Sequence, residues 1–182
     1  GNFADDLSRL GDADWVIEAV SEDLEIKRQI WASVAPHLRS GAIASTNTSG
    51  ITISSIAQAL PQALRPRFLG AHFFNPPGHM RLLEVIPSNE TDREVVTELS
   101  RFAEDVLGKG VVIARDVPNF IANRVGVYSL MVGLRAMEEY GLQPDQVDSI
   151  TGPAMGRPRS ATFRTLDLVG LDVLVRVCEN NR

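Results

Sequence analysis

The alternation of strand and helix patterns in the first sixty residues constrains the fold of this chain more than any other feature. Trp15–Val20 is a short apolar run, typical of a strand buried on both faces. Apolar residues at four-residue spacing follow and predict the buried stripe of a helix, which Ser21 caps: Ile26, Ile30 and Val34. A second short strand, Ala42–Ser45, precedes a polar turn and a short helix capped by Ser54 or Ser55. This order predicts an α/β fold with a parallel sheet.

The next two strands are expected to run antiparallel. Arg67–Phe74 and Arg81–Pro87 both have strand patterns, and the residues between them are too few for a crossover helix. Thr91–Glu94 matches a capping box and opens a helix. The apolar stripe of that helix is predicted at Val95, Leu99, Phe102 and Val106. A further strand, Val111–Ala114, completes this part of the chain.

No strand pattern remains after Pro118. Phe120 to Tyr140 predicts one long helix, whose uncharged stretch Val125–Leu134 is expected in a helical layer or an oligomer interface. Shorter helices are expected at Asp145–Ile150, Ala161–Val169 and Leu171–Glu179. We therefore expect an α/β domain over 1–116 and an all-α domain over 117–182. The first has no glycine-rich phosphate loop and the second is short for a core of its own, so both are expected to be partial.

Composition and charge exclude several classes of protein. With 44% hydrophobic and 23% charged residues, the 182-residue chain is neither collagen-like nor a disordered acidic tail. Its single cysteine, Cys178, excludes an internal disulfide and favours a reducing, cytoplasmic location. The net charge is −5 and the basic residues are scattered, so we expect no nucleic-acid partner. No apolar run approaches the roughly 18 residues of a membrane helix, so we expect no membrane partner.

Two polar residues interrupt apolar strand patterns. His72 and Glu84 lie symmetrically about Gly78, so an antiparallel return centred there places them opposite one another. A carboxylate beside an imidazole fixes the tautomer that a general base requires. A structural histidine with an unrelated edge glutamate is an equally weighted alternative. His72, His79 and Glu84 lack the regular spacing and the fourth ligand of a metal site, so we expect no metal.

Two further polar residues are candidates for binding a ligand. Asn123 lies on the helix face formed by Phe120, Val127, Leu130 and Leu134, where its amide needs a structural carbonyl or a ligand as partner. Ser49 follows the second strand, at the carboxyl end where ligands of open α/β sheets bind. A turn-forming serine is the alternative. Its surroundings are not the G-x-S-x-G elbow of a hydrolase nucleophile.

The segments around these residues resemble the L-3-hydroxyacyl-CoA dehydrogenases of fatty-acid β-oxidation. The resemblance extends from about Asp14 to Asp172. It is carried, in order and spacing, by Val16–Val20, Asn47–Ser49, His72–Pro76, Leu83–Ile86 and Asp116–Arg124. The sequence HFFNP followed by LEVI is its most specific part. The glycine- and proline-rich segment from Gly152 resembles the long bacterial members that also carry an enoyl-CoA hydratase-like part.

The resemblance implies a Rossmann-type NAD-binding domain, a helical domain that also mediates homodimerisation, and an acyl-CoA substrate between them. It implies that His72 is the base, that Glu84 pairs with it, and that Ser49 and Asn123 hold the substrate oxygens. His72 would take the 3-hydroxyl proton as hydride leaves C3 for NAD. The residues expected to contact the NAD cofactor are Glu22, Lys27, Asn47, Ser49 and Asn75.

The sequence also departs from the family pattern. The G-x-G-x-x-G turn and the acidic residue expected on the adenosine ribose do not occur in it. The family's usual NTSS is NTSG here, and its Pro-Gly-Phe is Pro118-Asn-Phe120. We therefore expect an internal segment of a dehydrogenase with half of the cofactor site. A non-catalytic oligomeric protein on the same scaffold and a dehydrogenase of another hydroxy acid are the alternatives. The presence of all four substrate-site residues favours the hydroxyacyl-CoA enzyme.

Overall fold

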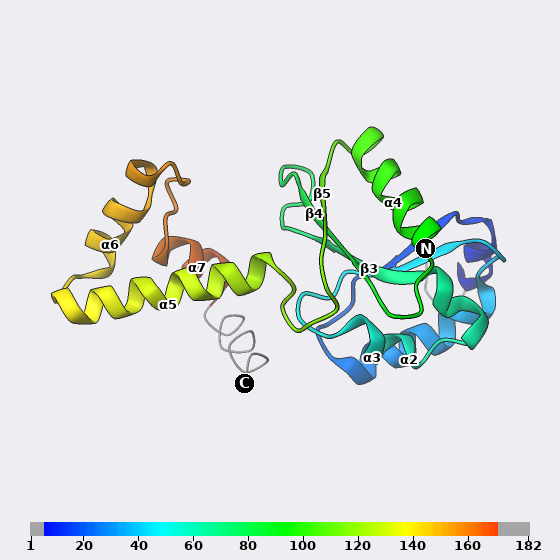
Figure 1. The fold of residues 1–182 in the computed structure, drawn as a ribbon. Helices are drawn as coiled ribbons and strands as arrows, with labels where there is room; N and C mark the ends of the chain where they lie inside the picture. Colours follow the sequence, from blue (N-terminus) through cyan, green and yellow to red (C-terminus); the bar gives the residue numbers. More distant parts are fainter. Residues whose placement is uncertain (1–5, 171–182) are drawn as a thin grey trace. The chain divides into compact units, whose positions relative to one another are not determined.

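The computed structural model describes residues 6–170 of the chain. These residues form two compact units that divide after Phe120. The first unit contains strands and helices, and the second contains helices alone (Figure 1). The helix predicted at 171–179 and Cys178 lie outside the described residues.

A sheet of five strands forms the centre of the first unit, as far as residues 6–120 are described. In chain order and in spatial order these are β1 (Trp15–Glu18), β2 (Ile43–Thr46), β3 (Phe68–Phe73), β4 (Leu82–Pro87) and β5 (Gly110–Ile113). The first three strands run parallel, β4 is antiparallel to β3, and β5 is parallel to β4. The predicted βαβ start and the predicted antiparallel return are confirmed.

Helices cover both faces of this sheet. On one face lie α2 (Leu24–Val34) and α3 (Ile53–Ala57), and on the other lies α4 (Arg93–Asp105) (Figure 1). Phe68 packs in the core on the α2 and α3 side, and its neighbour Leu69 packs on the α4 side. Successive strand residues point to opposite faces, which gives the unit two apolar cores. The 3₁₀ helix η1 (Leu7–Asp12) precedes β1, and η2 (Ala35–His37) and η3 (Gln62–Arg67) lie in the connections that lead to β2 and β3.

The first strand and helix differ from the prediction in detail. β1 is an edge strand and leaves 43% of Ile17 exposed, so it is not buried on both faces. The buried residues of α2 are Lys27, Trp31 and Val34. Of the predicted stripe, Val34 is buried and Ile30 is partly buried against the core, but Ile26 is 41% exposed because the buried Lys27 takes its place on the inner face. Asp23, not Ser21, caps the helix through the backbone N–H groups of residues 25 and 26.

The capping box predicted at the start of α4 does not form. The N-cap residue Asp92 makes no side-chain cap bond. The Thr91 hydroxyl donates instead to the carbonyl of Phe68 at 2.6 Å, so no capping box forms. The buried stripe of α4 is Val95, Leu99 and Ala103. The predicted members Phe102 and Val106 are 42% and 65% exposed.

A carboxylate distant in sequence caps α3. Asp116 accepts hydrogen bonds from the N–H groups of Ile53 at 2.5 Å and Ser54 at 2.9 Å. Ser54 and Ser55, which were predicted as caps, lie inside the helix. Because Asp116 belongs to the segment that leads out of β5, this contact joins the end of the first unit to α3.

The second unit contains α5 (Ala122–Tyr140), α6 (Pro144–Thr151), η4 (Pro153–Met155) and α7 (Phe163–Val169) among its described residues. The long predicted helix forms, but it begins at Ala122 and ends at Gly141, whose φ of 64° is left-handed. Phe120, predicted as its first residue and as part of the Asn123 face, precedes the helix and packs in the core of the first unit. Leu130 is the buried residue of α5, whereas Val125 and Tyr128 are 63% and 73% exposed. Across residues 6–170, no helix has the length and apolar character needed to cross a membrane.

Candidate active site

A buried histidine and a buried glutamate form the centre of the candidate site. His72 of β3 and Glu84 of β4 are directly opposite in the antiparallel register, as predicted. His72 Nδ1 and Glu84 Oε2 are 2.7 Å apart, and the two residues are 4% and 1% exposed. When the carboxylate is ionised, Nδ1 carries the proton that it donates to Glu84. The other ring nitrogen, Nε2, is then the free acceptor that a general base needs.

Aromatic rings line the imidazole. The ring centroid of Phe74 lies 4.5 Å from that of His72, and the centroid of Phe120 lies 5.7 Å away. These apolar walls keep water from much of the imidazole surface, and electrostatic interactions are stronger in such surroundings than in water. His72 therefore lies in an environment where the charge of Glu84 acts on it with little screening.

The carboxyl ends of the three parallel strands meet at one edge of the sheet, next to this pair. Asn47, which follows β2, joins all three of them. Its backbone N–H donates to the carbonyl of Glu18 at 2.7 Å, and its Oδ1 accepts from the backbone N–H of Phe73 at 2.9 Å. The predicted binding residue Asn47 is thus a brace between β1, β2 and β3, and it holds the loop that carries Ser49 beside the end of β3.

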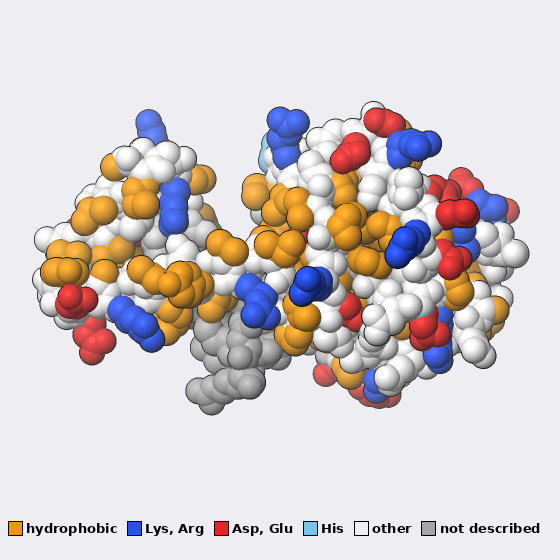
Figure 2. All heavy atoms as spheres, viewed as in Figure 1, with side chains coloured by type: hydrophobic (Ala, Val, Ile, Leu, Met, Phe, Trp, Pro, Cys, Tyr) orange, Lys and Arg blue, Asp and Glu red, His pale blue; other side chains and the backbone are white. Residues whose placement is uncertain are grey.

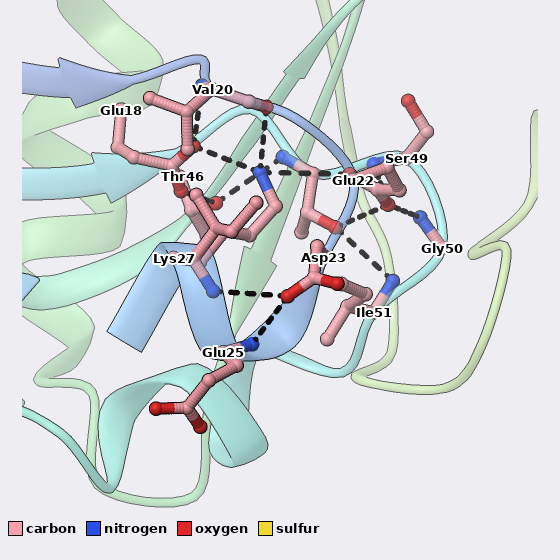
Figure 3. Close-up of polar contacts among 12 residues, drawn as sticks. Glu18, Val20, Glu22, Asp23, Glu25, Lys27, Thr46, Ser49, Gly50 and Ile51 are labelled. Carbon is pink, nitrogen blue, oxygen red and sulfur yellow. Dashed lines mark hydrogen bonds and ion pairs between the residues drawn. The ribbon is translucent and has the colours of Figure 1, made fainter. Parts of the chain in front are cut away.

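Glu22 anchors the turn that contains Ser49 (Figure 3). Its Oε1 accepts hydrogen bonds from the hydroxyl of Thr48 at 2.6 Å, the N–H of Ser49 at 2.9 Å and the N–H of Gly50 at 2.8 Å. The structure therefore brings two predicted site residues together, with Glu22 supporting Ser49 from the loop after β1.

Lys27 is buried next to Glu22. Its Nζ is 2.8 Å from Glu18 Oε1, 3.2 Å from the carbonyl of Val20 and 3.6 Å from Glu22 Oε2 (Figure 3). Glu18 was missed by the sequence analysis, and so was Thr46, whose hydroxyl donates to Glu18 Oε2 at 2.7 Å. A signal was present: a carboxylate ends an apolar strand nine residues before a lysine of the next helix, and buried charges require partners.

Two predicted site residues, Asn75 and Asn123, are not among the residues described so far. Asn75 is exposed in the loop after β3, next to a cis peptide bond to Pro76. Asn123 is in the first turn of α5, in the second unit, and is half-buried. It shares the less exposed side of that helix with Val127 and Leu130, as predicted. Within residues 6–170, no group of three or more His, Cys, Asp or Glu side chains could hold a metal ion.

Comparison with known proteins assigns the family. Residues 1–117 match the NAD binding domain of 3-hydroxyacyl-CoA dehydrogenase, and residues 120–182 match the C-terminal domain of the same enzyme. The chain belongs to the 3-hydroxyacyl-CoA dehydrogenase family. The resemblance found in the sequence and the expected fold class, a Rossmann-type domain followed by a helical domain, are confirmed.

Members of the 3-hydroxyacyl-CoA dehydrogenase family align along nearly the whole chain. It is 52% identical over 180 residues to the "Probable 3-hydroxyacyl-CoA dehydrogenase" of Bacillus subtilis, covering 99% of this chain and 23% of that protein. It is 51% identical to the protein of the same name from Deinococcus radiodurans, covering 97% of this chain and 51% of that protein. The crystal structure of Mycobacterium tuberculosis FadB2 is 35% identical, with a TM-score of 0.88 over 96% of this chain and 61% of that one. The chain thus spans about a quarter to a half of these curated relatives.

The family match indicates NAD as the cofactor, and the residues present fit its nicotinamide nucleoside end. The hydroxyl of Ser49, the amide of Asn75 and the carboxylate of Glu22 suit an amide and ribose hydroxyls. They do not suit a diphosphate, and the buried Lys27 is held by Glu18. The sequence contains no G-x-G-x-x-G turn that could bind the diphosphate.

Proposed function

We propose that this chain carries the catalytic residues for NAD-dependent oxidation of L-3-hydroxyacyl-CoA to 3-oxoacyl-CoA in fatty-acid β-oxidation. The buried hydrogen bond between His72 and Glu84 is the observation that carries the proposal. The carboxylate of Glu84 accepts the Nδ1 proton and fixes the ring orientation, which leaves the lone pair of Nε2 to accept a hydroxyl proton.

Each residue then has a defined role. His72 Nε2 takes the proton of the 3-hydroxyl group, and Glu84 stabilises the imidazolium that results. The Ser49 hydroxyl and the Asn123 amide hold the substrate oxygens. When bound, NAD accepts the hydride that leaves C3. In the reductive direction the His72 imidazolium returns the proton to the oxygen.

The proposed cofactor contacts divide into two groups. Glu22, Ser49 and Asn75 lie in the loops after β1, β2 and β3, where ligands of open α/β sheets bind. Asn47 and Lys27 bind neighbouring loops and strands, so we propose that they support the cofactor site through those contacts.

We further propose a homodimer formed through the helical unit, in the cytoplasm. Figure 2 shows hydrophobic side chains gathered along α5, and Val125, Tyr128 and Tyr140 are 63%, 73% and 69% exposed. Apolar surface of this kind is typical of protein interfaces. On the face shown, Lys and Arg side chains are scattered among Asp and Glu. Light scattering should give the mass of two chains.

The proposed activity is tested by an assay with NADH and acetoacetyl-CoA on the protein expressed from its complete open reading frame. The parent protein should oxidise NADH, and His72→Ala should lower the turnover by about 10²–10⁴-fold, the usual contribution of a general base. His37→Ala, at an exposed histidine of η2, is the matched control and should leave turnover unchanged. An inactive parent protein would favour the non-catalytic scaffold, and an active His72→Ala would refute the assignment of the base.

A further inference from the structure

Glu18 and Lys27 form an ion pair in the interior of the first unit. Their side chains are 2% and 1% exposed, and their charged atoms are 2.8 Å apart. Glu18 also accepts from the N–H of Val20 at 2.8 Å and from the hydroxyl of Thr46 at 2.7 Å. A buried ammonium is costly unless it is paired and hydrogen-bonded, and Glu18 and the carbonyl of Val20 supply those partners to Lys27.

A second carboxylate lies within reach of the same ammonium. Glu22 Oε2 is 3.6 Å from Lys27 Nζ, farther than Glu18. The other oxygen of Glu22 accepts the three hydrogen bonds from Thr48, Ser49 and Gly50. Glu22 therefore has one set of partners on each oxygen: the donors of the Ser49 turn on Oε1 and the buried lysine on Oε2.

Removal of Glu18 would set these two sets of partners in competition. A lysine without Glu18 would have Glu22 as the nearest carboxylate, and a direct ion pair between them would draw the Glu22 carboxylate away from the turn. With Glu18 in place, Lys27 is satisfied in the interior and Glu22 remains on the turn. Ser49 follows Glu22, because its own N–H is one of the three donors.

We propose that Glu18 is a positioning residue for Ser49: it retains Lys27 and thereby leaves Glu22 to hold the Thr48–Gly50 turn. The consequence for turnover rests on the proposed function, in which Ser49 holds a substrate oxygen. The consequence for the turn itself does not depend on it.

The test that is independent of activity is amide hydrogen exchange in the protein from its complete open reading frame. Glu18→Gln keeps the size and hydrogen-bonding capacity of the side chain but removes its charge. The Ser49 and Gly50 amides should exchange at least about tenfold faster, as expected for the loss of a hydrogen bond to a charged group. Amides of β3 and β4 serve as the reference for global stability. Glu25→Gln, at an exposed acid in the first turn of α2, is the matched control. It should change neither the exchange of the turn amides nor that of the reference amides.

A second variant separates competition from simple loss of structure. In Glu18→Gln/Lys27→Met both buried charges are absent, so nothing competes for Glu22. Exchange at Ser49 and Gly50 should return to within about threefold of the parent, since replacing a whole buried ion pair is often nearly neutral. If Glu18→Gln fails to fold, amide exchange at the turn can still be measured in this double variant. Unchanged exchange at the turn in Glu18→Gln would overturn the proposal, and so would turn amides that stay fast in the double variant.

A second experiment measures turnover. Glu18→Gln should lower kcat when it is introduced alone, but it should have a smaller effect when Ser49→Ala is already present. A residue that acts through Ser49 has little left to change once the Ser49 hydroxyl is absent. Equal effects in both backgrounds would show that Glu18 does not act through Ser49. If the parent protein has no dehydrogenase activity, the proposed function fails, whereas the exchange experiment still decides the role of Glu18.

Discussion

At the scale of single residues, two buried side-chain pairs at the carboxyl edge of the sheet organise the candidate site. The hydrogen-bonded His72 and Glu84 are one pair, and the ion pair of Lys27 and Glu18 is the other. A buried polar group is destabilising when its partner is removed, so each pair couples local stability to the orientation of a functional group. The first pair sets the tautomer of the imidazole, and the second leaves Glu22 free to hold Ser49.

Glu84→Gln tests the first pair. A glutamine oxygen can still accept the proton of His72 Nδ1, so the ring keeps its orientation. The negative charge that stabilises the imidazolium is lost. Turnover should fall, though by less than in His72→Ala, and NADH affinity should barely change. Steady-state kinetics and a fluorescence titration of NADH measure the two quantities. A large loss of NADH affinity with normal turnover would contradict the assigned role.

At the scale of elements, the close approach of β3 to α3 supports the strand that carries His72. Gly70 lies two residues before His72, on the side of the sheet that faces α3. A Cβ atom at this position would be 2.6 Å from Ile53 Cδ1 and 3.0 Å from Ile86 Cδ1. Both isoleucines are fully buried, so neither side chain has free space into which it can move.

Gly70→Ala should therefore destabilise the protein by about 1–3 kcal/mol, the usual range for overpacking of a core. Chemical unfolding followed by circular dichroism measures the change. Gly78→Ala is the matched control, because no heavy atom lies within 4 Å of a Cβ built there. Equal unfolding free energies for the two variants would show that β3 and α3 are not closely packed at this point.

At the scale of the whole molecule, the chain carries two functional parts of the family in separate compact units. The first unit holds His72, Glu84 and Ser49, and the second holds Asn123. The match to the NAD binding domain covers residues 1–117, yet the sequence contains no G-x-G-x-x-G turn. That turn places the diphosphate on a helix N-terminus and contributes much of the binding of a dinucleotide.

Residues 1–182 alone should accordingly bind NADH more weakly than micromolar. Fluorescence titration measures the affinity, and circular dichroism checks that the 182-residue chain is folded. Micromolar affinity of a folded 182-residue chain would show that its own loops suffice for the dinucleotide.

The sequence by itself determined the order of the elements and the antiparallel return between β3 and β4, and it offered the pairing of His72 with Glu84 as one of two alternatives. A short symmetric connection leaves little choice of register, and the register predicted from it was correct. Periodicity located the helices but misplaced part of the buried face of α2 and of α4. The segments that carry the family resemblance are also readable without coordinates.

Only the tertiary structure decided which side chains anchor the loops. Asp116 caps α3 from more than sixty residues away, and Glu22 binds the turn after β2. Lys27 takes a core position where an apolar residue was expected, because Glu18 on a neighbouring strand pairs with it. Such contacts depend on which strand ends meet at one edge of the sheet. No local pattern encodes that meeting, since hydrogen bonds and ion pairs act between groups that folding alone brings within reach.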